Sequence, residues 1–126
     1  MALFQGISLH MTVYIDPANL PTFWKAFKPV YEAVIAEPEC TFFEVYQDPE
    51  NPGTITWVEN WSKPMEWLVE VQANKPYYKE YFAATVPLYL KPREVKVLDR
   101  VGTPYVAVKM ENGGYNRALD DVKKVV

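Results

Sequence analysis

The sequence predicts an α+β fold of the ferredoxin-like order β-α-β-β-α-β, in which helices cover one face of a four-stranded antiparallel sheet. Four short segments alternate between apolar and polar residues or are rich in strand-forming residues. Two segments between them carry apolar residues at helical spacing. A length of 126 residues is enough for one domain with its own core and too short for two.

The first strand is expected at residues 7–15, where side chains of the two kinds alternate. Its apolar face holds Ile7, Leu9, Met11, Val13 and Ile15, and its polar face holds Ser8, His10, Thr12 and Tyr14. Asp16-Pro17 and Asn19-Leu20-Pro21 each offer an N-cap residue followed by proline, so a helix is expected to begin at one of them. Its apolar residues continue to Ile35, and Pro29 is expected to kink it.

The next two strands are expected at residues 40–47 and 54–61. The polar and rigid turn between them, Asp-Pro-Glu-Asn-Pro-Gly at 48–53, predicts that they form an antiparallel hairpin. Alternation in the second of these strands places one set of side chains on a common face: Ile55, Trp57, Glu59 and Trp61.

The second helix is expected in two pieces, a short one from Pro64 and a longer one from Pro76 to about Leu88. A fourth strand is expected from Val95 to Val101. The order of elements then matches the split βαβ arrangement.

The predicted domain spans residues 1–104, and residues 105–126 form a C-terminal extension. Tyr105 to Met110 alternates like a fifth strand, Asn112-Gly113-Gly114 predicts a turn, and Ala118 to Val126 fits a short helix. A sheet with helices on one face leaves its other face open, and a symmetric partner commonly covers such a face. We therefore expect a homodimer in which the extension packs on the partner.

Composition and charge argue against several classes of protein. A net charge of −3 gives no attraction for nucleic acid or for anionic membrane surfaces. No apolar run approaches the roughly 20 residues that span a bilayer, and Met1 to Met11 lacks the features of a secretory signal, so a cytoplasmic location is expected. One Cys and one His do not build a disulfide or a typical nitrogen or sulfur metal site, so no metal is expected.

Three segments resemble the motif pattern of the antibiotic biosynthesis monooxygenase family, a family of dimeric α/β barrels. They are Glu37-Pro38-Glu39-Cys40 with the strand Phe42 to Tyr46, the turn Asp48 to Gly53, and Glu59-Asn60-Trp61-Ser62 before a helix. With the element order, the resemblance covers residues 7 to 101. It implies a dimer in which two sheets face one another, with a separate pocket in each subunit between sheet and helices.

The resemblance also implies a range of activities. Members include oxygenases of polyphenols and quinol-forming polyketides that use no metal or flavin, haem-degrading enzymes, and proteins without an established activity. This sequence departs from the pattern at Glu70, where many members carry a helical His. The His with which haem-degrading members hold iron has no counterpart in the segment Lys75 to Phe82, which disfavours haem degradation.

His10, Tyr14 and Glu70 are the candidate catalytic residues. Imidazole accepts a proton at neutral pH, so His10 is the natural general base, and Tyr14 could share a substrate oxygen with it. Both lie on the polar face of the first strand, and if that face meets a partner sheet they are interface residues instead. Glu70 is an alternative base if it is buried, because burial raises the pKa of a carboxyl group; a solvated surface residue is the other reading.

The candidate substrate-binding residues are aromatic: Trp57, Trp61, Tyr78, Tyr81 and Phe82. Aromatic residues make up 15% of the chain, enough to line a cavity, although a bulky core and a dimer interface explain them equally well.

The predicted function is a monooxygenase, acting without a cofactor on an aromatic polyketide-like or phenolic substrate in secondary metabolism. Two alternatives remain open. One is a cofactor-free cyclase, dehydratase or isomerase that acts on a similar substrate. The other is a dimeric ligand-binding or stress-related protein without catalysis.

Overall fold

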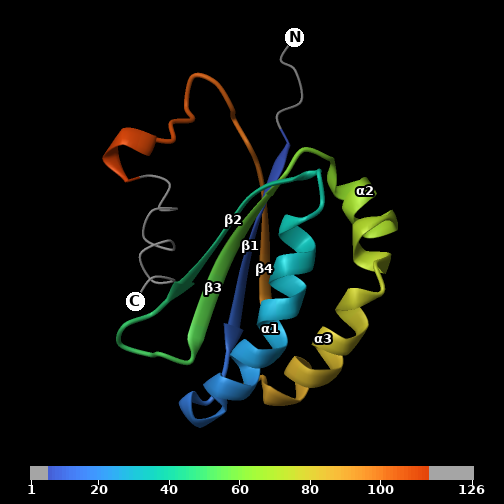
Figure 1. Ribbon diagram of the computed structural model, residues 1–126, viewed down its shortest axis with the longest axis vertical. Coiled ribbons are helices and arrows are strands. Elements are labelled where there is room, and N and C mark those ends of the chain that lie inside the picture. The colour runs from blue at the N-terminus through green and yellow to red at the C-terminus, as the bar shows by residue number, and fades with distance from the viewer. Residues whose placement is uncertain (1–5, 114–126) are drawn as a thin grey trace, which may run out of the picture.

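The computed structural model describes residues 6–113. Four strands and three α-helices make up the domain (Figure 1): β1 (Ile7–Tyr14), α1 (Leu20–Ile35), β2 (Cys40–Gln47), β3 (Thr54–Trp61), α2 (Met65–Glu70), α3 (Tyr77–Thr85) and β4 (Glu94–Asp99). Short 3₁₀ turns flank the helices at Pro17–Asn19, Gln72–Asn74 and Val86–Leu88, and a fourth lies at Met110–Asn112.

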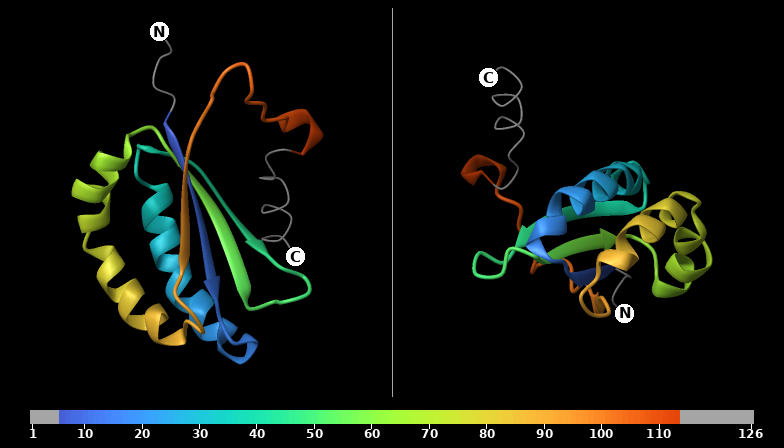
Figure 2. Two further views of the ribbon diagram at one scale, coloured as in Figure 1. Left: turned by 180° about the vertical axis from the view of Figure 1, so that it is seen from behind. Right: turned by 90° about the horizontal axis from the view of Figure 1, so that it is seen from below.

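The four strands form one antiparallel sheet in the order β2-β3-β1-β4. All three helices lie on one face of this sheet, and no described helix covers the other face (Figures 1 and 2). The predicted ferredoxin-like order is confirmed, with the second helix in the two pieces that the prolines indicated.

The alternation in β1 decides which side chains meet the helices. Ile7, Leu9, Met11 and Val13 are buried under the helices, and the residues between them lie on the open face. The same holds in β3, where the residues paired with this apolar set are buried: Ile55, Trp57, Glu59 and Trp61. The helix-facing side of the two central strands is therefore the floor of the core.

Helix α1 uses both of the predicted start signals. Asp16 caps a 3₁₀ turn by accepting a hydrogen bond of 2.9 Å from the amide of Ala18, and the α-helix then begins at Leu20. Pro29 lies inside the helix, which continues to Ile35. Phe27 is the centre of the core on this side, because its ring contacts those of Phe23, Trp24, Tyr31, Phe43, Trp57 and Tyr81.

The prediction of a fifth strand at residues 105–110 is wrong. Within the described residues, 105–110 contains no strand, and the segment leaves the domain as an irregular arm (Figure 2). Alternating sequence forms a strand only where it pairs with a free sheet edge, and this arm stands apart from the strands of the sheet (Figure 2). Its apolar side chains are open to solvent, Tyr105 being 81% and Val108 62% exposed. The helix expected at 118–126 lies outside the described residues.

Candidate functional site

The main candidate site is a pocket of about 190 Å³ between the sheet and the α2–α3 side of the helical layer. Leu9, Met11, Glu59 and Trp61 form its floor, since they are the helix-facing residues of β1 and β3. Tyr78, Phe82 and Gln72 come from the helical side. The lining is mostly apolar and aromatic with a few polar groups, as is usual in sites for small organic molecules.

Glu59 is the buried carboxylate of this pocket and is only 8% exposed. Trp57 and Trp61 flank it two positions away on the same face of β3. The indole Nε1 of Trp57 donates to Oε2 at 2.8 Å, and that of Trp61 donates to Oε1 at 2.9 Å. Each carboxylate oxygen therefore holds one indole N–H and keeps further capacity to accept a hydrogen bond or a proton.

Burial raises the pKa of Glu59 above the ordinary value of a glutamate. The two indole hydrogen bonds and the positive charge of Arg93 favour the ionised form and oppose that rise. An upward shift of its pKa suits Glu59 to the role of general base, because the carboxylate then binds a proton more strongly and can still release it.

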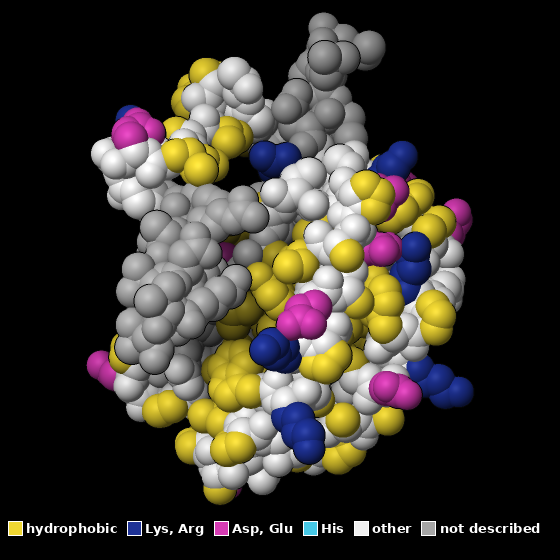
Figure 3. All heavy atoms as spheres, in the orientation of Figure 1, with side chains coloured by type: hydrophobic (Ala, Val, Ile, Leu, Met, Phe, Trp, Pro, Cys, Tyr) yellow, Lys and Arg dark blue, Asp and Glu magenta, His cyan; other side chains and the backbone are white. Residues whose placement is uncertain are grey.

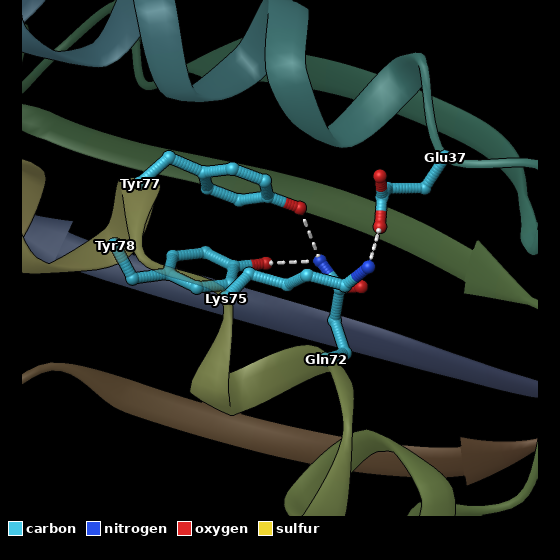
Figure 4. Close-up of polar contacts among 5 residues, drawn as sticks. All are labelled: Glu37, Gln72, Lys75, Tyr77 and Tyr78. Carbon is cyan, nitrogen blue, oxygen red and sulfur yellow. Dashed lines mark hydrogen bonds and ion pairs between the residues drawn. The ribbon is translucent and has the colours of Figure 1, made fainter.

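A polar cluster fixes the helical wall opposite the sheet (Figure 4). Gln72 is 2% exposed, and its Nε2 donates to the hydroxyl oxygens of Tyr77 at 2.7 Å and Tyr78 at 2.9 Å. Next to it, an ion pair of 2.9 Å between Lys75 and Glu37 joins the start of α3 to the segment after α1. Burial raises the pKa of Tyr78, so its phenol stays neutral and acts through hydrogen bonds.

The structure brings the predicted aromatic residues together. Trp61, Tyr78 and Phe82 line the 190 Å³ pocket. Trp57 and Tyr81 line a smaller cavity of about 40 Å³ directly beside it. Met11, Glu59, Tyr78, Phe82 and Arg93 belong to the walls of both spaces.

The three predicted catalytic residues lie elsewhere. His10 and Tyr14 are on the open face of the sheet, where His10 Nε2 lies 3.0 Å from the hydroxyl of Ser8 and the Tyr14 ring lies 4.0 Å from the Lys91 ammonium. Glu70 is exposed at the end of α2 and is not part of the pocket lining. Of the two readings left open for the polar side of β1, the structure favours the one outside the pocket, because the helices, and the pocket beneath them, cover the apolar side of this strand.

Two residues of the site were missed. The signal for Glu59 was present in the sequence, because a carboxylate between two tryptophans on the apolar face of an alternating strand must be buried with them. Arg93 precedes β4 in an irregular segment, and its guanidinium carbon lies 5.0 Å from the centre of the Phe82 ring. No pattern in the sequence marked it.

Residues 6–113 contain no group of three or more His, Cys, Asp or Glu that could hold a metal ion. No described helix is long and apolar enough to cross a membrane. On the face shown in Figure 3, side chains of both charges lie among hydrophobic ones.

Comparison with known proteins connects this architecture to a family. The family model described as "Antibiotic biosynthesis monooxygenase" matches residues 6–68, which contain β1 to β3, α1 and Glu59. The chain belongs to the antibiotic biosynthesis monooxygenase family. It is also 38% identical over 96 residues to a protein of Pestalotiopsis microspora named "Putative monooxygenase GME11364", an alignment that covers 76% of this chain and 80% of that protein.

Solved structures of other proteins show the same fold. A protein of Caulobacter crescentus, named for antibiotic biosynthesis monooxygenase, superposes with a TM-score of 0.70 at 27% identity, covering 79% of this chain and 93% of that one. A conserved protein of Methanosarcina mazei superposes with a TM-score of 0.69 at 22% identity, covering 77% and 94%. The resemblance of the three sequence motifs to this family is thus confirmed.

Proposed function

We propose that this protein is a monooxygenase that uses dioxygen to oxidise an aromatic phenolic substrate of the polyketide type, without a metal or organic cofactor, and that Glu59 is its general base. The observation that carries the proposal is the buried carboxylate of Glu59 in the wall of an aromatic pocket. Membership of the antibiotic biosynthesis monooxygenase family supports the reaction class, and a role in cytoplasmic secondary metabolism fits it.

The substrate itself supplies the electrons in this chemistry. Glu59 removes a proton from the phenol or from its keto tautomer, and the resulting anion transfers one electron to dioxygen. The carbon radical and superoxide combine into a carbon–oxygen bond, and the peroxide takes a proton back from Glu59. Loss of water leaves a carbonyl, so a CH₂ carbon and O₂ become C=O and H₂O.

The pocket favours this reaction in two ways. Apolar walls exclude water, which strengthens the electrostatic interactions of the anion with nearby groups. Arg93 places a positive charge on the wall shared by both cavities, where it stabilises the negative charge that forms on the substrate and then on oxygen. A volume of about 190 Å³ is below the range of roughly 300–1,000 Å³ typical of drug-sized ligands, which favours a substrate of one or two rings.

We also propose that two copies pair through their open sheet faces to form a dimeric α/β barrel. Phe42, Tyr46 and Leu98 are partly exposed on that face, at 39%, 44% and 38%. Residues 105–126 would pack on the partner, which would cover apolar side chains of the arm such as Tyr105 and Val108. His10 and Tyr14 would then belong to the interface.

Isotope labelling tests the reaction class. The protein is incubated under ¹⁸O₂ with a panel of mono- and dihydroxynaphthalenes, with heat-denatured protein as the control for spontaneous oxidation. We expect one labelled oxygen atom in the product and consumption of one O₂ per product. A product without label contradicts the proposal and favours a cyclase, dehydratase or isomerase. Binding of the same compounds without any product favours the non-catalytic reading.

A further inference from the structure

We infer that the 40 Å³ cavity beside the main pocket is a binding site for dioxygen, held apart from the aromatic substrate. The inference rests on the proposed function, because dioxygen is its co-substrate. The cavity is lined by residues of α1, α3 and the strands β1, β2 and β3, together with Arg93. Phe27, Val30 and Val34 of α1 form one of its sides.

The size of the cavity suits a diatomic molecule. A space of about 40 Å³ is large enough for a molecule of two atoms, since one water needs roughly 10–15 Å³, and it is far too small for an aromatic ring system. The lining includes hydrocarbon and ring surfaces from Met11, Phe27, Val34 and Phe43. Small apolar gases bind in such places, as xenon does in apolar protein cavities.

The position of the cavity suits the reaction. Glu59 and Arg93 belong to the walls of both spaces, so a molecule in the small cavity lies next to the carboxylate that would ionise the substrate. Transfer of one electron from the substrate anion to dioxygen produces superoxide beside the Arg93 guanidinium. The two spaces share lining residues, so the superoxide forms next to the substrate carbon to which it bonds, and no other oxidant is needed.

Water is the competing occupant. A buried water needs two to four polar partners. Each oxygen of Glu59 accepts one indole hydrogen bond and the hydroxyl of Tyr78 accepts one from Gln72, but the remaining lone pairs of Glu59 and the guanidinium of Arg93 are also polar groups of this lining. The hydroxyl of Tyr81 is buried in this region without a hydrogen-bond partner and could hold a water. The occupant is therefore a question that a crystal can answer directly.

Crystals of the full chain pressurised with xenon test the site without any turnover. We expect a xenon atom between Phe27, Val34 and Tyr81, and no fully occupied water there in the unpressurised crystal. An ordered water that xenon does not displace overturns the inference. Because xenon binding requires no reaction, this result is independent of whether the protein proves to be an oxygenase.

A kinetic test uses Val34, which lines the small cavity and not the main pocket. Val34→Ile adds one methylene to the cavity, and a methylene in a tight apolar site changes binding by about 10-fold. We expect the KM for dioxygen to rise by about this factor while the KM for the phenol stays the same. Val30→Ile is the second variant if Val34→Ile does not fold.

Val86→Ile is the matched control, because it adds the same methylene at a position that is 52% exposed. An unchanged KM for dioxygen in both cavity variants overturns the inference even if the wild-type protein oxygenates its substrate. Absence of oxygen consumption by the wild-type protein contradicts the proposed function instead, so the two failures are distinguishable.

Discussion

At the scale of single residues, the site depends on the carboxylate of Glu59, which loses favourable solvation when the fold buries it. Two indoles and Arg93 compensate part of the desolvation of Glu59, but the balance still raises its pKa. A structural clamp for two tryptophans would need only an acceptor, for which a neutral side chain is cheaper to bury. The presence of a buried ionisable group on the pocket wall is a reason to assign it chemistry.

The raised pKa of Glu59 predicts a pH-dependent stability. The folded protein holds this proton more tightly than the unfolded chain, whose glutamates titrate near 4.3. The stabilising contribution is therefore complete below that unfolded pKa and is lost as the pH rises through the folded pKa. We expect the free energy of unfolding of the wild type to fall relative to that of Glu59→Gln as the pH rises above the unfolded pKa.

Urea unfolding at a series of pH values measures this difference. Glu66→Gln, at an exposed position in the first turn of α2, is the control and should run parallel to the wild type. Parallel curves for wild type and Glu59→Gln would contradict the raised pKa.

At the scale of elements, the sequence predicted most of the fold because alternation and proline signals are local. The bounds of β2 and β3 match the prediction. Both predicted helix starts before α1 also occur, the first as a 3₁₀ turn after Asp16 and the second as the start of α1 after Asn19. The fourth strand lies at Glu94–Asp99, a little earlier than expected. What could not be read locally was tertiary: whether 105–110 finds a sheet edge, and on which face of β1 the pocket opens.

The turn between β2 and β3 gives a prediction at this scale. Gly53 lies against the end of β1, where its carbonyl accepts a hydrogen bond of 2.8 Å from the amide of Ile15. An added Cβ would come within 1.7 Å of the Ile15 carbonyl oxygen, a backbone atom that cannot move aside alone. We expect Gly53→Ala to lower the free energy of unfolding by about 2 kcal/mol or more.

Glu50→Ala in the same turn is the control for Gly53→Ala, because its side chain is exposed, and it should change stability by less than about 0.5 kcal/mol. Both are measured by chemical denaturation. Equal stability of the two variants would contradict the close packing of this turn on β1.

At the scale of the whole molecule, the open sheet face and the arm at 101–113 are the features that a single copy does not explain. Val58 lies near the centre of that face, paired with His10 on one side and Glu44 on the other. In a symmetric dimer a charge there would face its own copy or apolar surface. We expect Val58→Glu to convert a dimer to a monomer in light scattering coupled to gel filtration.

Val86→Glu, which places the same charge at an exposed position of the helical layer, should leave the dimer intact. A dimer that survives Val58→Glu would show that the copies do not meet through this face. His10 would then be free to face solvent, and the role of the open face would have to be sought elsewhere.

The most direct test of the account compares the two faces of the sheet in one assay. Oxygen consumption with a phenolic substrate is measured for wild type, Glu59→Gln and His10→Ala. A lost general base lowers turnover by about 100-fold or more. We predict this loss for Glu59→Gln, and activity within a few-fold of wild type for His10→Ala. Loss of activity in His10→Ala with normal activity in Glu59→Gln would contradict the account.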